Sequence, residues 1–188
     1  MLFRSIAAVA LALRSDIRRI VVAWFASLRA PRRSDADARM GWFVILGTVP
    51  IAVVGLLGRD LVKGPLRSLW WVAGALVGWS AVMVAAEVLA RQNRRATDLR
   101  SRDALAVGAF QAAALVPGIS RSGATISGGL FCGFDRVTAT RFAFLLAIPA
   151  MSAAAVFEVG DALSGGVGWL PTLIGTRSEE HTSELQSP

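Results

Sequence analysis

Apolar residues occur along this chain in continuous runs that short basic segments separate. Residues 40–58 and 69–90 are each apolar over about the 20 residues that cross a bilayer as a helix. Residues 140–159 form a further run, and another begins at 168–175. Continuous runs of this length predict transmembrane helices, whereas the strands of a membrane β-barrel would alternate apolar and polar positions.

A different pattern precedes the first run. Between residues 17 and 28, apolar side chains recur at helical spacing and basic residues lie around them. The apolar positions are Ile17, Ile20, Val21, Trp24 and Leu28. An amphipathic helix of this kind is expected to lie on the membrane surface.

Two apolar pieces that are too short to cross the bilayer meet at a polar break. Residues 104–116 end at Pro117-Gly118, and residues 123–134 follow Arg121. Two half-length helices predict a re-entrant hairpin with its free ends near the middle of the membrane. One long, kinked helix through Arg121 is the alternative.

The composition agrees with a membrane protein. Of 188 residues, 54% are hydrophobic and 18% are charged, whereas a soluble domain has about 25% charged residues. The predicted fold class is an all-α polytopic membrane protein, with transmembrane helices and a re-entrant helical hairpin.

The net charge of +7 reflects basic residues that lie between the apolar runs. In that position they indicate membrane topology, so the expected partner is the lipid bilayer and no nucleic acid is expected. Residues 14–39 and 91–102 carry more Lys and Arg than residues 59–67. The positive-inside rule therefore places the first two segments in the cytoplasm and the third outside.

The polar break contains the residues with the clearest chemistry. Arg121 lies among apolar residues, where a guanidinium is costly and usually functional. Ser120, Ser122 and Thr125 supply hydroxyl groups, and Gly123 allows close approach of an anion to the backbone. A helix that begins near Gly123 would point its positive end into the break, which predicts a phosphate site. In the alternative, Arg121 pairs with an internal carboxylate or extends to the interface, and the serines cap helices.

Residues 117–129, Pro-Gly-Ile-Ser-Arg-Ser-Gly-Ala-Thr-Ile-Ser-Gly-Gly, resemble the second signature motif of the bacterial undecaprenyl-diphosphatases, the bacitracin-resistance membrane phosphatases. Gln111, residues 85–87 and residues 144–149 also resemble that family. The resemblance implies two inverted repeats, each with a re-entrant hairpin, in the bacterial plasma membrane. It also implies hydrolysis of undecaprenyl diphosphate to undecaprenyl phosphate, which recycles the lipid carrier of peptidoglycan synthesis and confers bacitracin resistance.

The resemblance also assigns roles to residues. Arg121 would be the catalytic residue that holds the diphosphate, and Ser120 and Thr125 would bond its oxygens. Gln111 either lines the cavity or packs between helices, and Glu87 is expected at the cytoplasmic interface. The implied substrate-binding residues are Ser120, Arg121, Ser122, Gly123, Thr125 and Gln111. A divalent cation, Mg²⁺ or Ca²⁺, is implied with ligands outside this chain, and a homodimer is compatible with the resemblance.

The glutamate-rich motif of that family, with its serine-rich turn and histidine, is not found in this sequence. Residues 1–176 are therefore predicted to be one integral membrane domain, an internal fragment of a longer protein that is inactive alone. Residues 177–188 are polar, contain the only histidine, His181, and resemble a translated sequencing adapter.

Three other functions fit parts of the pattern. An acid-phosphatase-like lipid phosphatase would need catalytic histidines, which residues 1–176 lack. A transporter or flippase of a phosphorylated polyprenyl lipid would use the same broken helices. A structural membrane subunit would leave Arg121 unexplained.

Overall fold

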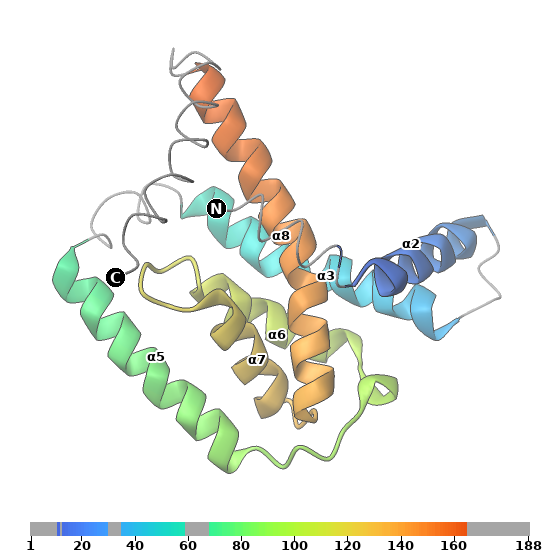
Figure 1. The fold of residues 1–188 in the computed structure, drawn as a ribbon, viewed down its shortest axis with the longest axis horizontal. Coiled ribbons are helices and arrows are strands. Elements are labelled where there is room, and N and C mark those ends of the chain that lie inside the picture. Colours follow the sequence, from blue (N-terminus) through green and yellow to red (C-terminus); the bar gives the residue numbers. More distant parts are fainter. Residues whose placement is uncertain (1–10, 12, 30–34, 59–67, 165–188) are drawn as a thin grey trace, which may run out of the picture.

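The computed structural model describes residues 11, 13–29, 35–58 and 68–164, with side chains as far as residue 156. The described residues form helices and no β-strand, which confirms the all-α class (Figure 1). In chain order the elements are α2 Arg14–Arg29, α3 Ala36–Leu57, α5 Leu69–Leu89, the short 3-10 helix η2 Ala96–Asp98, α6 Ser101–Ala113, α7 Arg121–Phe131 and α8 Arg136–Ser164.

Three of the described helices are long and apolar enough to cross a membrane, over Ala36–Leu57, Leu69–Leu89 and Arg136–Val156. They correspond to the runs predicted at 40–58, 69–90 and 140–159. The helix α3 continues through Pro50, and the helix α8 begins after Asp135, whose carboxylate accepts the Thr138 N–H at 2.7 Å. The run predicted at 168–175 lies outside the described residues.

The helices α6 and α7 form the predicted hairpin. They have 13 and 11 residues, so each is about 20 Å long or less and falls short of a 30 Å hydrocarbon core. The chain reverses between them, because the start of α6 and the end of α7 both bind the same side chain, Arg94. The single kinked helix through Arg121 is therefore wrong: Gly118, with φ of +99°, turns the chain back.

The two helices α3 and α6 pack with their backbones nearly in contact. A Cβ atom added to Gly108 would lie 2.1 Å from the Gly47 carbonyl oxygen, and one added to Gly47 would lie 2.8 Å from Leu146. Glycines at such positions let membrane helices approach closely. Gly47 thus provides the contact that places the hairpin beside α3.

We expect Gly108→Ala to destabilise the protein by about 1–3 kcal/mol, because the new methyl group must push α6 from α3. Thermal unfolding of the purified chain in detergent measures this. Gly74→Ala is the matched control, since a Cβ there meets no atom within 4 Å and alanine favours helix by about 1 kcal/mol. Equal unfolding temperatures for the two variants would contradict the close contact.

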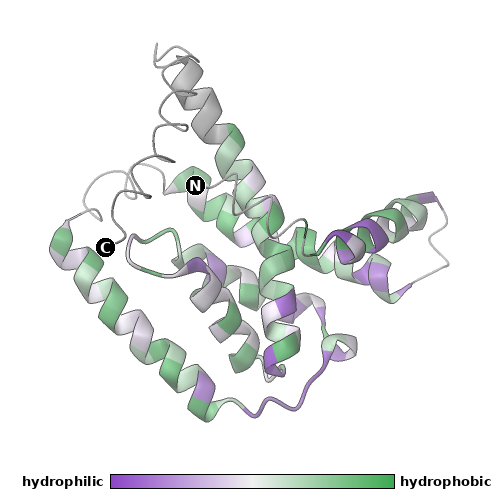
Figure 2. Ribbon diagram, viewed as in Figure 1, coloured by the Kyte–Doolittle hydropathy of each residue, from purple (hydrophilic) through white to green (hydrophobic). Residues whose placement is uncertain are grey.

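The two basic segments meet at one end of the bundle. Arg19 and Arg39, from the first, line the same cavity as Thr97, from the second. Figure 2 shows hydrophilic residues gathered on α2, on the segment between α5 and α6, and at the start of α8, whereas α5 is hydrophobic along most of its length. The described parts of the two basic segments therefore lie at the same end of the bundle. The connection 59–67 lies outside the described residues.

The turn between α6 and α7 lies toward the opposite end. A Cβ atom on Gly118 would be 2.5 Å from the carbonyl oxygen of Val72, which belongs to the first turn of α5. The turn thus lies farther from the basic end than the predicted middle position, because residues 114–117 extend beyond the end of α6 before Gly118 turns the chain back.

The amphipathic helix α2 forms as predicted and packs on α3 with part of its apolar face. Ile20 is buried, and the Trp24 and Trp42 rings meet edge to face with centroids 5.6 Å apart. Val21 and Leu28 remain exposed. The position of α2 on a membrane surface stays a prediction.

Candidate functional site

The polar break is organised by the start of α7. Ser120 is the N-cap residue, and its hydroxyl accepts the Gly123 N–H at 3.3 Å. Capping by serine satisfies one of the free N–H groups in the first turn. The helix therefore begins at Arg121, two residues before the predicted start near Gly123. Ser120 has the helix-capping role that the alternative interpretation gave to the serines.

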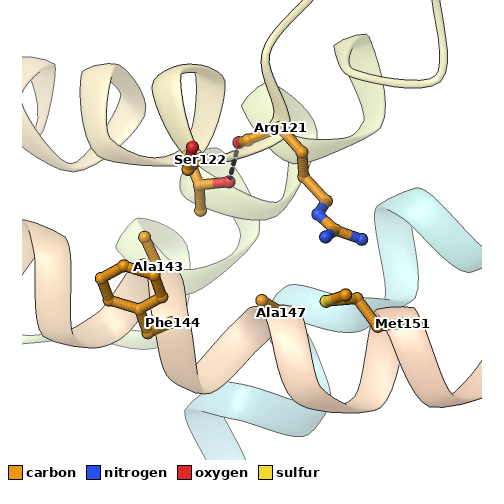
Figure 3. A pocket seen from close by; sticks show the side chains of 7 residues that line it. Arg121, Ser122, Ala143, Phe144, Ala147 and Met151 are labelled. Carbon is orange, nitrogen blue, oxygen red and sulfur yellow. Dashed lines mark hydrogen bonds between the residues drawn. The ribbon is translucent and has the colours of Figure 1, made fainter. Parts of the chain in front are cut away.

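Arg121 is half-buried and extends across a cavity of about 300 Å³ between α7 and α8. Figure 3 shows its guanidinium directed toward Ala147 and Met151 of α8. The cavity is lined by Arg121, Ser122, Thr125, Ala143, Phe144, Ala147 and Met151. No carboxylate among the described residues forms an ion pair with Arg121, so the internal pairing of the alternative interpretation is not found there.

The charges around this cavity favour an anion. Arg121 supplies a full positive charge, and the first turn of α7 adds the positive end of the helix dipole. The opposite wall consists of Ala143, Phe144 and other apolar side chains of α8. A half-buried guanidinium against an apolar wall is stabilised by an anionic group that both pairs with it and forms hydrogen bonds.

The hydroxyl groups of the break differ in their availability. Ser122 is exposed on the first turn of α7 and lines the cavity. Thr125 also lines it, but its hydroxyl donates to the Arg121 carbonyl oxygen at 2.7 Å. In this rotamer Thr125 can only accept a hydrogen bond from a ligand. The Ser122 hydroxyl lies 3.4 Å from the Ser120 hydroxyl, and either group can be the donor in that hydrogen bond. When Ser120 donates, Ser122 can donate to an anion in this cavity.

Gly123 and Gln111 lie away from the cavity surface. Gly123 is buried, and a Cβ there would be 2.7 Å from the Met83 sulfur, so it lets α5 approach α7. Gln111 is fully buried on α6, and among the described residues neither amide atom has a hydrogen-bond partner. An unsatisfied buried amide is costly, and no contact in the described chain accounts for it. The substrate-binding roles of both residues stay predictions.

The cavity wall on α8 could not be assigned to the site from residue patterns alone. Ala143, Ala147 and Met151 recur at intervals of four residues, so they share one helix face. The same spacing is common in any packed helix. Residues 144–149 were singled out only through their resemblance to the family.

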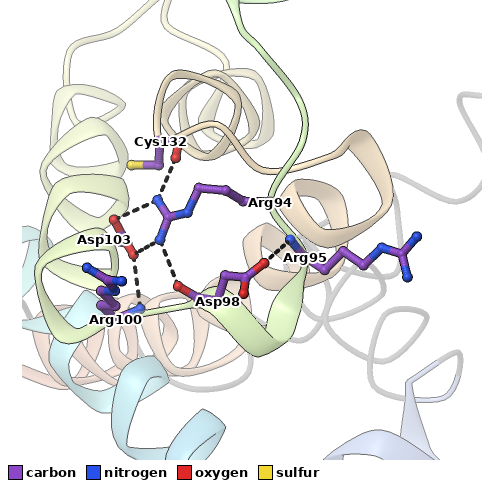
Figure 4. Close-up of polar contacts among 6 residues, drawn as sticks. All are labelled: Arg94, Arg95, Asp98, Arg100, Asp103 and Cys132. Carbon is purple, nitrogen blue, oxygen red and sulfur yellow. Dashed lines mark hydrogen bonds and ion pairs between the residues drawn. The ribbon is translucent and has the colours of Figure 1, made fainter.

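A second group of residues, which the sequence did not reveal, holds the open end of the hairpin. The Arg94 guanidinium donates to both Asp103 carboxylate oxygens, at 3.1 and 2.6 Å, and to the carbonyl oxygens of Cys132 and Asp98, at 2.6 and 2.7 Å (Figure 4). It also lies 4.5 Å from the centroid of the Phe134 ring. Arg94 therefore connects the start of α6 with the end of α7.

The ionisation of Asp103 reflects these contacts. Burial raises the pKa of this carboxyl group, but hydrogen bonds from Arg94 and from the Arg100 N–H more than offset burial, so its pKa lies below the usual value. The bond to Asp103 correspondingly raises the pKa of Arg94. The pair is charged at neutral pH.

Glu87 lies at the basic end of the bundle, and its predicted position at the cytoplasmic interface stays a prediction. Glu87 forms an ion pair with Arg136, which joins the end of α5 to the start of α8. Both side chains are partly exposed, so the contribution to stability is small. Glu87 does not line the Arg121 cavity.

These features define a class of protein: a helical membrane protein with a hairpin of two short helices, beside whose turn a half-buried arginine lines a cavity. The family model described as bacitracin resistance protein BacA matches residues 2–179. The chain therefore belongs to the BacA bacitracin-resistance family. The match ends close to residue 177, where the foreign tail is predicted to begin; that tail lies outside the described residues and its origin stays a prediction.

Curated relatives are similar over most of this chain. A protein of Acidothermus cellulolyticus named undecaprenyl-diphosphatase is 54% identical over 165 residues, which cover 87% of this chain and 60% of the relative. One of Mycolicibacterium smegmatis with the same name is 54% identical over 147 residues, covering 78% of this chain and 53% of the relative. Undecaprenyl-diphosphatase 3 of Frankia casuarinae is 48% identical over 167 residues, covering 87% and 60%. The chain thus spans about 53–60% of these relatives.

Proposed function

We propose that the protein to which this sequence belongs hydrolyses undecaprenyl diphosphate to undecaprenyl phosphate and phosphate in the bacterial plasma membrane. The observation that carries the proposal is the half-buried Arg121 guanidinium, which faces an apolar wall and has no carboxylate partner in the described chain. The names of the relatives support the same reaction. This activity would recycle the lipid carrier of peptidoglycan synthesis and would explain bacitracin resistance.

The residues of the cavity have distinct tasks in this proposal. Arg121 binds two oxygens of the diphosphate through its planar guanidinium and stabilises the charge that develops on the leaving phosphate. Ser122 donates a hydrogen bond to a third oxygen. Phe144 and Ala147, across the cavity, contact the first part of the prenyl chain and exclude water from that side. The site thereby separates a polar half for the diphosphate from an apolar half for the lipid.

Activation of the attacking water needs a group that the described cavity does not contain. Its lining residues include no carboxylate and no imidazole. We propose that the glutamate-rich and histidine motif of the family supplies the base. The implied divalent cation also remains a proposal: hydroxyl groups and a guanidinium are a poor ligand set for Mg²⁺ or Ca²⁺, and no group of three potential ligands occurs among the described residues.

We also propose that the basic segments 14–39 and 91–102 face the cytoplasm. Arg121 then lies beyond the middle of the bundle. Ala147 and Met151 flank its guanidinium. They lie about 17 and 23 Å along α8 from its first residue, Arg136, at a rise of about 1.5 Å per residue. The substrate diphosphate would therefore enter from the side opposite the basic segments. A homodimer stays a prediction.

The decisive experiment measures substrate binding and substrate hydrolysis separately. The 188-residue chain in detergent should bind farnesyl diphosphate, a short prenyl diphosphate, more tightly than farnesol. The longest natural polypeptide that contains residues 1–176 should in addition release inorganic phosphate from undecaprenyl diphosphate. Binding without release by that longer polypeptide would favour a transporter or flippase instead, and no preference for the diphosphate would refute the site.

A further inference from the structure

A second cleft, on the opposite face of α8 from the Arg121 cavity, lies between α2, α3 and α8. It consists of two adjoining cavities, a basic one of about 100 Å³ and an apolar one of about 210 Å³. Ile20 and Leu145 line both, so the two cavities lie side by side. Neither shares a residue with the cavity around Arg121.

The basic part of the cleft has an excess of positive charge. Arg19, Arg39 and Arg141 line it, together with Asp37. Arg19 pairs with Asp37 at 2.6 Å, and Arg141 pairs with Asp16 at 2.7 Å. Two carboxylates thus face three guanidinium groups, and Arg39 has no ion pair among the described residues. One singly charged anion would balance the group.

The apolar part continues from the basic part toward the middle of the bundle. Along α3, Arg39 is followed by Val44 and Ile45, and along α8, Arg141 is followed by Ile148 and Pro149. Both helices begin at the basic end, so the residues of α3 and α8 that line the cleft become less polar with distance from that end. Trp24 of α2 forms another side of the apolar cavity.

We propose that this cleft binds one anionic phospholipid. Its phosphodiester group lies between Arg39 and Arg141, and an acyl chain lies along the apolar cavity beside Ile45. A soluble phosphate would bind only the basic part of the cleft. A phospholipid has a charged group for the basic part and an adjoining apolar chain for the apolar part. Basic pockets between helices on the cytoplasmic side are known sites for acidic lipid head groups. This site does not depend on the proposed phosphatase activity.

Native mass spectrometry of the 188-residue chain tests the charged half of the site. Dioleoyl phosphatidylglycerol should be retained in preference to dioleoyl phosphatidylcholine at equal concentrations. Arg39→Gln should reduce retention of phosphatidylglycerol about fivefold, the effect of one arginine near a membrane surface. Arg91→Gln is the matched control, because Arg91 is an exposed arginine of the basic end that lines neither cavity. Equal retention of the two lipids, or equal effects of the two variants, would overturn the proposal.

The apolar half is tested by filling it without a change in charge. Ile45→Trp should lower phosphatidylglycerol retention, whereas Val84→Trp on the exposed side of α5 should not. Both positions are partly exposed, so the folded chain should tolerate both substitutions. Glycerol phosphate should fail to displace the lipid; displacement at equal concentration would show a site for free anions. Loss of a dimer peak in Arg39→Gln, with no lipid retained by the parent chain, would instead identify a second copy as the occupant.

Discussion

Replacing Arg121 with alanine is expected to weaken binding of farnesyl diphosphate by the 188-residue chain about 100-fold or more. Each hydrogen bond between charged groups contributes about 1.5–3 kcal/mol, and the guanidinium can form two with the diphosphate. The apolar wall opposite Arg121 offers no group that could replace them. Equilibrium binding of labelled farnesyl diphosphate in detergent measures the loss. In the longest natural polypeptide, kcat/KM for phosphate release should fall at least as far.

Two further variants show whether the geometry of Arg121 matters or only its charge. Arg121→Lys keeps the charge but loses the planar pair of donors, so its affinity should lie between those of the parent and the alanine variant. Arg102→Ala removes an exposed arginine that does not line the cavity and should leave binding unchanged. The proposed role would be refuted if Arg102→Ala and Arg121→Ala had the same affinity while both kept the parent's circular dichroism spectrum.

Replacing Arg94 with alanine is expected to cause the largest loss of stability, about 2–4 kcal/mol, because it leaves the Asp103 carboxylate buried without its partner. The Asp103 side chain is 9% exposed and that of Arg94 is 28% exposed, so solvent screens the pair only in part. The two chain segments that Arg94 connects would separate at the open end of the hairpin (Figure 4). Thermal and denaturant unfolding in detergent measure the effect.

The matched control is Arg91→Ala, which removes a nearby exposed arginine and should cost less than 0.5 kcal/mol, roughly the limit for surface substitutions. The pair also predicts a pH dependence. The pKa of Asp103 is lower in the folded chain, so its contribution to stability is complete above the unfolded pKa of about 4 and is lost as pH falls through the folded pKa. Asp103→Asn should remove this part of the acid destabilisation. An unchanged pH profile in Asp103→Asn would argue against the pair.

Much of this architecture follows from local sequence patterns. The spans at 40–58 and 69–90 and the two half-length helices around Pro117-Gly118 were predicted at nearly the observed bounds. Bilayer thickness dictates the length of a spanning helix, and a Pro-Gly pair interrupts a helix through the backbone alone. Arg121 could likewise be singled out as a candidate site residue, because a guanidinium within an apolar run is costly wherever the rest of the chain lies.

The contacts around these elements were decided by the tertiary structure. The residues that face Arg121 come from α8, more than 20 positions later, and Arg94 binds Cys132 from 38 positions away. Neither pairing has a local signal, because side chains distant in the sequence meet only when helices pack. The same applies to Gly108, whose role is visible only in its contact with Gly47.

The sequence by itself therefore determined the membrane class, the helical hairpin and the charged residue at its turn, because each depends on the free energy of a short segment in lipid. The tertiary structure alone decided which partners the hydroxyl groups beside Arg121 have, which wall faces Arg121, and how the hairpin is held at its open end. Ser120 caps α7 and Thr125 bonds its own helix, whereas Ser122 lines the cavity and its hydroxyl contacts only that of Ser120 among the described residues. Those outcomes depend on distances between helices, which no single segment specifies.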